Sequence, residues 1–282
     1  MNDADRIVYL NGEFLRLVDA KVSVLDRGFI YGDGVYEVVP VYRRKPFRMA
    51  QHLARLARTL DGVRLADPHP GRWPALIEEL IVRQPFDDQA VYLQVTRGVA
   101  KRDHAFPKGV APTVFMMSNP LSLPSREQVE HGAAVVTADD NRWLRCDLKT
   151  TSLIGNVLMR QFAADNDAIE TVMFRDGYLT EASASNVLVV RDGVVIAPPK
   201  DNLILPGITY DATLEIAQGA NIRLEVRPVS RDETMSADEM WLSSSSKEVL
   251  AVTRVDGQPF AGGEPGPVFR RVYEAFQARK PK

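Results

Sequence analysis

The chain has 282 residues, of which 45% are hydrophobic and 26% charged, a composition typical of soluble globular proteins and a length that favours two domains over one. Its net charge of −2 provides no broad electrostatic reason to bind nucleic acid or an anionic membrane. Residues 1–6 are acidic and no long apolar run follows them, which argues against a signal peptide or a membrane span. We therefore expect a cytoplasmic protein.

The cysteine and histidine content gives no sign of a disulfide or a metal centre. Cys146 is the only cysteine, so no disulfide can form within the chain. The histidines are scattered without the spacing of metal ligands, at positions 52, 69, 104 and 131. We expect no bound metal.

The first part of the chain reads as mixed helix and strand. Residues 7–25 alternate apolar and polar side chains around Asn11-Gly12, which predicts an opening β-hairpin. Gly28, Gly32 and Gly34 lie within seven residues and favour either close backbone approach or an ordinary turn. A β-branched and aromatic run over 35–42, alternation over 90–97 and an apolar run over 113–118 predict strands. Helical spacing predicts helices over 52–65 and 73–83.

The segment 119–126 contains two prolines among small polar residues and is the best candidate for a linker. It would separate a smaller N-terminal α/β domain, residues 1–118, from a larger C-terminal domain, residues 127–282. In the latter the pattern predicts helices over 153–164, 209–218 and 268–279 and strands over 132–137, 171–175, 187–191, 194–197 and 239–242. The fold class is therefore α+β.

Lys149 occupies the centre of residues 142–156, between an apolar and basic run and a predicted helix. A lysine in this position could be a nucleophilic amine, although most lysines are solvated surface cations. The chain lacks a G-x-G-x-x-G motif at a strand-to-helix junction, a Walker loop and a G-x-S-x-G motif. Dinucleotide and nucleoside triphosphate chemistry are therefore disfavoured.

Several short segments, spread in order over most of the chain, carry a family resemblance. They are Asp26-Arg27-Gly28, Gly32-Asp33-Gly34-Val35-Tyr36-Glu37, Gln94-Val95-Thr96-Arg97-Gly98, Arg142-Trp143-Leu144-Arg145-Cys146-Asp147-Leu148-Lys149, Thr180-Glu181 with Ser185-Asn186-Val187, and Gly207-Ile208-Thr209. Together they resemble the fold type IV pyridoxal-phosphate-dependent aminotransferases, the class that includes D-amino acid and branched-chain aminotransferases. The resemblance implies a two-domain architecture with the cofactor, pyridoxal 5′-phosphate, between the domains.

The resemblance also implies roles at the reacting end of the cofactor. Lys149 matches the Schiff-base lysine, whose amine would afterwards move the proton between the substrate Cα and the cofactor. Glu181 matches the carboxylate that pairs with the pyridine nitrogen and keeps it protonated. Without the family pattern, Glu181 would read as a surface glutamate at the end of a strand.

A second group of residues matches the phosphate-binding part of the family. It comprises Arg55, Ile208 and Thr209 with their backbone amides, and the pair Ser244 and Ser245. Gly207-Ile208-Thr209 precedes a predicted helix, and a helix N-terminus is a natural anion site. The serine run is less specific, because serines at a strand end often form a solvated loop.

The substrate class is indicated by Tyr36, Arg102 and His104. Arg102-Asp103-His104 reproduces the Arg-x-His loop of D-amino acid aminotransferase, in which both side chains come from the neighbouring subunit and grip the α-carboxylate with the tyrosine. Arginine suits this task because its fork can donate two hydrogen bonds to one carboxylate. The resemblance thus implies a homodimer and ping-pong transfer from D-alanine or D-glutamate to 2-oxoglutarate or pyruvate. The plainer interpretation is a charged loop tip.

Two positions depart from the family pattern: Tyr210 replaces an arginine that commonly follows Gly-Ile-Thr, and Ala184 replaces a frequent serine. Three alternatives remain open. A branched-chain L-amino acid aminotransferase and an aminodeoxychorismate lyase share the fold and the cofactor, and a third interpretation is a protein that only binds a ligand or partner. The Arg102 and His104 pair favours the D-amino acid enzyme over the first two.

Overall fold

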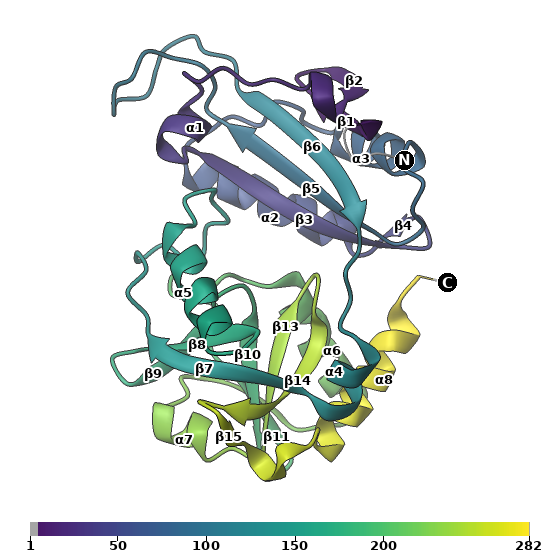
Figure 1. The fold of residues 1–282 in the computed structure, drawn as a ribbon, viewed down its shortest axis with the longest axis vertical. Helices are drawn as coiled ribbons and strands as arrows, with labels where there is room; N and C mark the ends of the chain where they lie inside the picture. The colour runs from purple at the N-terminus through teal and green to yellow at the C-terminus, as the bar shows by residue number, and fades with distance from the viewer. Residues whose placement is uncertain (1–4, 282) are drawn as a thin grey trace. The chain divides into compact units, whose positions relative to one another are not determined.

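The computed structural model describes residues 5–281, which form two compact units (Figure 1). The first unit comprises Met1–Ser122, Leu148–Leu153 and Pro281–Lys282, and the second comprises Leu123–Asp147 and Ile154–Lys280. The chain crosses from the first unit to the second within the segment 119–126. It returns to the first unit for the six residues around Lys149, a return that the expected boundaries do not include.

The first unit is built on a six-stranded antiparallel sheet with the order β2-β1-β6-β5-β3-β4. Its strands are β1 (Ile7–Leu10), β2 (Glu13–Arg16), β3 (Gly34–Tyr42), β4 (Lys45–Pro46), β5 (Gln89–Thr96) and β6 (Thr113–Pro120). Leu10 pairs with Glu13, so Asn11-Gly12 is a two-residue turn, and both turn residues have positive φ. The predicted hairpin is therefore confirmed around Asn11-Gly12, with the geometry that favours Asn-Gly, but its second strand ends at Arg16 and not near Leu25.

One face of this sheet is closed by helices α2 (Met49–Gly62) and α3 (Trp73–Val82), and a short helix, α1 (Arg27–Tyr31), precedes β3 (Figure 1). Their apolar side chains form one core with the alternate residues of the strands, including Val35, Leu93 and Ile77. On the opposite face Tyr36 and Gln94, which are cross-strand partners, stay half-buried. This face is where the candidate site begins.

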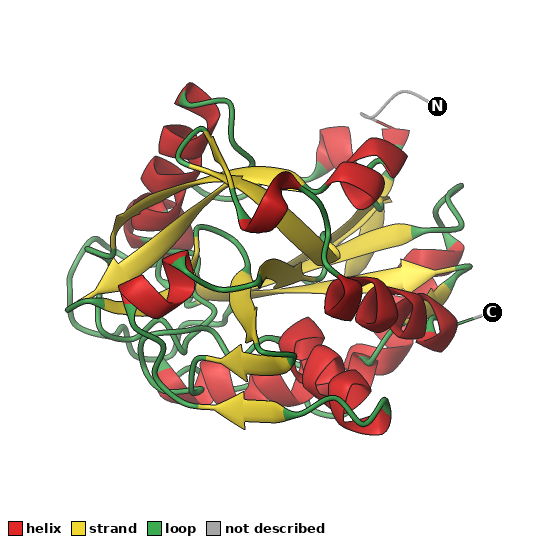
Figure 2. Ribbon diagram, turned by 90° about the horizontal axis from the view of Figure 1, so that it is seen from below, coloured by secondary structure: helices red, strands yellow, loops and turns green. Residues whose placement is uncertain are grey.

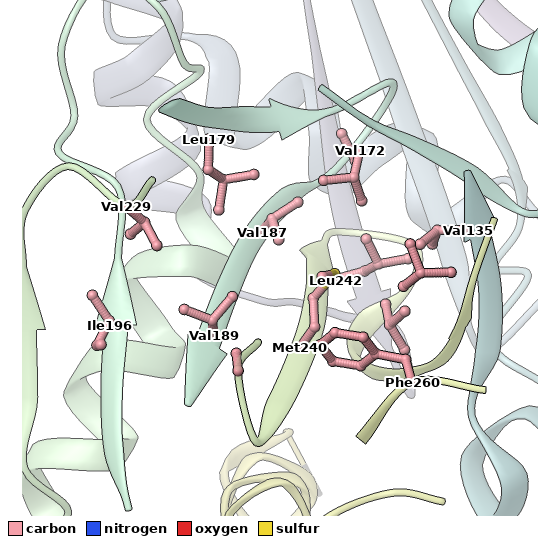
Figure 3. Close-up of a cluster of buried hydrophobic side chains, with 14 of the residues drawn as sticks. Val135, Val172, Leu179, Val187, Val189, Ile196, Val229, Met240, Leu242 and Phe260 are labelled. Atoms are coloured by element: carbon pink, nitrogen blue, oxygen red, sulfur yellow. The ribbon is translucent and has the colours of Figure 1, made fainter. Parts of the chain in front are cut away.

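The second unit contains a nine-stranded mixed sheet, ordered β12-β11-β10-β13-β14-β7-β8-β9, with β15 beside β14. The strands are β7 (Ala133–Asp139), β8 (Glu170–Arg175), β9 (Tyr178–Ala182), β10 (Asn186–Arg191), β11 (Val194–Ala197), β12 (Leu224–Val226), β13 (Glu239–Ser244), β14 (Glu248–Val255) and β15 (Gln258–Pro259). Side chains from many of them meet in a buried cluster around Val187, Leu242 and Phe260 (Figure 3).

The helices of the second unit are α4 (Arg126–His131), α5 (Ile154–Asp165), α6 (Ile208–Gly219), α7 (Arg231–Met235) and α8 (Pro267–Arg279). Both units combine strands with helices, as the predicted α+β class requires (Figure 2). Among residues 5–281 no helix has both the length and the apolar character needed to cross a membrane.

The long predicted elements are confirmed to within a few residues, whereas β9 and β14 were not expected. The expected apolar face of α5 carries an unexpected feature: Val157, Leu158 and Phe162 are 57%, 58% and 41% exposed. Within a single chain this stripe covers no core.

The core of the first unit provides a stability prediction. Leu93 on β5 is fully buried, so Leu93→Ala should lower the free energy of unfolding by about 2–5 kcal/mol through lost burial and a residual cavity. Val82, 74% exposed at the end of α3, is the control, and Val82→Ala should change the free energy by no more than about 0.5 kcal/mol. Urea unfolding of both variants measures the contrast, and equal losses would contradict the assignment of the core.

Candidate active site

Lys149 is held beside the first residues of β3 by backbone hydrogen bonds. The Tyr36 amide donates to the Lys149 carbonyl at 2.9 Å, and the Thr151 amide donates to the Gly34 carbonyl at 3.0 Å. The Lys149 Nζ atom lies 4.1 Å from the centre of the Tyr36 ring. The structure thus brings together two of the predicted site residues, a lysine amine and a tyrosine, within the first unit.

The glycines before β3 allow this close approach. Gly32 has a φ of +65°, and a Cβ on it would lie 2.8 Å from the Ser152 side chain. A Cβ on Gly34 would lie 2.9 Å from the Val95 carbonyl oxygen. The interpretation of this motif as a close backbone approach is therefore confirmed over that of an ordinary turn.

Arg55 is buried on α2 and its guanidinium is held by Glu37 of β3. Nε donates to Glu37 Oε1 at 2.7 Å and a terminal nitrogen donates to Oε2 at 2.9 Å, while His52 Nδ1 lies 2.9 Å from the same Oε2. Burial opposes the charge on Glu37, but Arg55 and His52 hold its pKa well below the ordinary value. Burial is the main cause that lowers the pKa of His52. Arg55 is thus a fixed, buried cation.

Arg102 and His104 lie on an exposed loop between β5 and β6. Within the chain both contact Tyr31: the Arg102 guanidinium lies 5.4 Å from the ring centre, and the His104 ring lies at the same distance. Among residues 5–281 no hydrogen bond or ring contact joins either side chain to Tyr36. A single chain therefore does not assemble the expected carboxylate-binding trio.

In the second unit, Glu181 is a buried residue of β9 and not a surface glutamate, being 6% exposed. Its Oε1 accepts from Arg142 at 2.6 Å, and its Oε2 accepts from the Leu205 amide at 3.0 Å and from Asn186 at 3.2 Å. Burial raises the pKa of Glu181 to about 7, although Arg142 acts in the opposite direction. Arg142 in turn donates two hydrogen bonds to Asp140. The contact between Arg142 and Glu181 thus gives the Glu181 carboxylate a cationic partner at a position that water barely reaches.

The first turn of α6 offers a place for an anion. Gly207 is its N-cap and supplies no side-chain cap, so the amides of Ile208 and Thr209 have no partner within the helix. A Cβ at Gly207 would collide with Asn186, 2.0 Å away. The cross-strand partner of Asn186 is Ser243, whose buried hydroxyl has no hydrogen-bond partner within residues 5–281.

Ser244 and Ser245 follow Ser243 and are half-buried, which places the serine run at this strand end and not in a fully solvated loop. The Ser244 hydroxyl accepts from the Lys247 amide at 3.1 Å and shapes the turn. Uncapped amides and an unpartnered buried hydroxyl suit the phosphate of the expected cofactor, because a phosphate accepts several hydrogen bonds. The residues present therefore fit the group.

Comparison with known proteins decides the family. The model of "Amino-transferase class IV" matches residues 34–255, which is most of the chain. The chain belongs to the class IV aminotransferases. It is 37% identical to a D-alanine aminotransferase of Bacillus licheniformis over 96% of this chain and 95% of that protein, and 37% identical to a D-alanine aminotransferase of Staphylococcus aureus strain N315 over 96% of both.

Solved structures agree with this assignment. The branched-chain amino acid aminotransferase of Escherichia coli superposes with a TM-score of 0.89 at 26% identity, covering 98% of this chain and 94% of that one. A T.th. branched-chain amino acid aminotransferase with pyridoxamine 5′-phosphate gives a TM-score of 0.90 at 26% identity, covering 98% and 95%. The predicted family, the fold class, the assignment as an enzyme and the cofactor, pyridoxal phosphate, are confirmed.

The sequence does not show which groups several polar residues of this aminotransferase pair with. Arg142, Asn186 and Glu37 all lie inside the quoted motifs, but nothing in their spacing indicates which carboxylate or guanidinium each one meets. Asp140 lies just outside a motif. The family motifs indicate that residues at these positions matter. Only the fold shows which charged or polar group each of them contacts.

The raised pKa of Glu181 generates a pH prediction for cofactor-free protein. Between about pH 4.5 and 7 the carboxyl of the unfolded chain ionises while the buried one keeps its proton, so stability is lost as the pH rises. Glu181→Gln removes this penalty. The difference in free energy of unfolding, Glu181→Gln minus unchanged protein, should therefore increase by about 3 kcal/mol as the pH rises from about 4.5 to 7. Urea unfolding at several pH values measures the slope, and a constant difference would contradict the buried, raised carboxyl.

Proposed function

We propose that this aminotransferase transfers the amino group of a D-amino acid of the D-alanine or D-glutamate type to a 2-oxo acid such as 2-oxoglutarate or pyruvate. The observation that carries the proposal is the 37% identity to proteins named D-alanine aminotransferase over 96% of the chain. The loop with Arg102 and His104 supports it, since two cationic or polar donors suit a substrate carboxylate. The transfer proceeds in two half-reactions, as a ping-pong mechanism requires.

Lys149 is the residue proposed to react. When bound, pyridoxal phosphate supplies an aldehyde for the amine and a ring that accepts electrons from the substrate Cα. Lys149 would hold the cofactor through its amine in the resting enzyme, and the same amine would afterwards carry the proton of the substrate Cα. Its place against the Tyr36 ring, 4.1 Å away, restricts the directions from which a substrate can approach the amine.

Glu181 is proposed to face the ring nitrogen. An ionised carboxylate there stabilises a proton on that nitrogen, and Arg142, 2.6 Å from Oε1, favours the ionised state. Hydrogen bonds from Asn186 and the Leu205 amide fix the direction of the other oxygen. By holding that proton, Glu181 would keep the bound ring in the state that accepts electrons.

The phosphate is proposed to bind at the first turn of α6. Ile208 and Thr209 supply amides, and Thr209 also supplies a hydroxyl. Ser244 and Ser245 close the site from the end of β13. Arg55 adds a cation whose fork Glu37 keeps in one orientation.

The substrate carboxylate is proposed to bind to Tyr36 of one subunit and to Arg102 and His104 of its partner in a homodimer. The first unit offers apolar surface for such a partner: Val24 and Phe29 are 71% and 76% exposed. Phe29 also lines a cavity of about 320 Å³, together with Leu10, Leu17 and Phe115, among other residues. Exposed apolar surface of this kind is typical of an interface.

The branched-chain L-amino acid enzyme is the second candidate, because the solved structures named above carry that activity in their names. The two candidates differ in the hand of the substrate. An assay with paired D- and L-amino acids therefore distinguishes them directly, and release of 4-aminobenzoate from aminodeoxychorismate would instead identify the lyase.

The proposed reaction and the role of Lys149 are tested together. Protein loaded with pyridoxal phosphate should convert D-alanine and 2-oxoglutarate to pyruvate, and should react far more slowly with L-leucine. Lys149→Ala should lose the visible absorption band of the bound cofactor and the activity, whereas Lys200→Ala, which removes an exposed lysine paired with Asp211, should retain both. A band that persists in Lys149→Ala would place the reactive amine elsewhere.

The proposed shared site predicts complementation between two defective chains. Arg102→Ala should raise the KM for D-alanine about 10- to 100-fold, since hydrogen bonds to a charged group contribute about 1.5–3 kcal/mol, and should leave the absorption band in place. Refolding Lys149→Ala and Arg102→Ala chains together should restore about a quarter of the activity when it is measured at a D-alanine concentration far below the raised KM of Arg102→Ala, because half of the dimers are mixed and each has one intact site. No recovery on mixing, in a preparation shown by sedimentation to be dimeric, would mean that Arg102 acts within its own chain.

A further inference from the structure

Behind the loop that carries Arg102 and His104 lies a buried ion cluster that the proposed mechanism does not use. Asp33 accepts from Arg27 Nε at 2.7 Å and from Arg97 Nε at 2.9 Å. The side chains of Arg27 and Arg97 are only 4% and 7% exposed, and that of Asp33 is 15% exposed. One carboxylate thus orients two buried guanidinium groups.

Arg27 also donates hydrogen bonds to the loop itself, which we define as residues 99–107. Its Nη1 donates to the carbonyl oxygens of Asp103 and of Ala105, the residues on either side of His104. The Asp103 side chain accepts from the Ala105 amide at 3.1 Å and tightens the same turn. The tip of the loop is therefore anchored through its backbone, and the side chains of Arg102 and His104 take no part in that anchor.

Arg97 anchors the end of the loop. Its guanidinium lies 3.7 Å from the centre of the Phe106 ring, and its terminal nitrogens donate to the carbonyls of Arg64 and Val63 at 3.0 and 2.8 Å. Burial works against the charge of Asp33, yet hydrogen bonds from Arg97 and Arg27 hold the pKa of this carboxyl below its usual value. The carboxylate therefore stays charged under working conditions.

We infer that Asp33 is a positioning residue: by fixing Arg27 and Arg97 it sets the place of loop 99–107, and so the place of Arg102 and His104 for the substrate carboxylate. The consequence for substrate binding rests on the proposed function, whereas the anchoring of the loop by Arg27 and Arg97 does not. Without the Asp33 carboxylate, the buried guanidinium groups of Arg27 and Arg97 repel each other and are more stable where water can solvate them. Arg27 then leaves the carbonyls of Asp103 and Ala105, and the loop loses its fixed position.

The test is Asp33→Asn in the cofactor-loaded protein, which keeps the size of the side chain and removes its charge. Hydrogen exchange of the amides in 99–107 should accelerate at least about tenfold while exchange in β3, β5 and β6 stays unchanged. The KM for D-alanine and for 2-oxoglutarate should each rise about 10-fold, with kcat within about twofold and the visible absorption band unchanged, because only carboxylate binding is weakened.

Two further variants make the test specific. Arg27→Met removes the anchor of the loop tip directly and should reproduce the faster exchange and the KM increase, so the question stays answerable if Asp33→Asn does not fold. Asp87→Asn is the matched control, since Asp87 pairs with Arg44 on the surface before the start of β5, whereas the loop follows its end. Asp87→Asn should alter neither the hydrogen exchange of residues 99–107 nor the KM.

The outcomes separate this inference from the proposed function. Unchanged exchange in 99–107 for both Asp33→Asn and Arg27→Met overturns the inference, as does a loss of cofactor colour or of kcat with an unchanged KM. If exchange accelerates but KM changes neither in these variants nor in Arg102→Ala, the anchor is supported and the proposed carboxylate site fails. If Arg102→Ala raises KM while Asp33→Asn and Arg27→Met leave it unchanged, the inference is wrong and the proposed function stands.

Discussion

The candidate site depends on buried carboxylates that are each matched by a buried arginine. Glu37 meets Arg55, Glu181 meets Arg142, and Asp33 meets Arg27 and Arg97, with most of these side chains less than 10% exposed. A buried ion pair adds little net stability over an apolar pair, because its desolvation costs about as much as its attraction returns. Such pairs do fix direction, since the arginine fork binds a carboxylate in one plane. They therefore serve geometry more than stability.

The three arrangements are not equivalent. Arg55 and His52 both face Glu37 and stabilise its charge, so that carboxylate is ionised under all ordinary conditions. Glu181 has one arginine, which it shares with Asp140, and burial raises its pKa to about 7. Glu181 is thus close to a balance between its two protonation states, as befits a group that is proposed to share a proton with the nitrogen of a bound ring. Glu37 does not change its protonation state in this way, and its role is to hold the Arg55 guanidinium in place.

The sequence predicts regular elements well where periodicity is strong, as in β5, α2 and α8, because an element with one buried face carries apolar residues at regular spacing along the chain. It did not predict β9, whose five residues include Thr180 and Glu181, since buried polar residues on a strand erase the apolar pattern. Family resemblance supplied what periodicity could not, including Lys149 and Glu181. The partners of these residues, Arg142 and Tyr36 among them, depend on contacts between elements distant in the chain and have no local signal.

The apolar stripe on α5 and the loop with Arg102 and His104 are hard to interpret from the sequence for the same physical reason. Helical spacing correctly marks Val157, Leu158 and Phe162 as one apolar face, and composition correctly marks the loop as charged. Neither pattern tells whether the complementary surface belongs to the same chain. In a single chain the stripe is exposed and the loop side chains contact Tyr31 and not Tyr36, so each lacks the partner that its chemistry requires. The proposed homodimer would supply such a partner for any surface that lies at its interface, because an isologous interface sets the same patches of both subunits against each other.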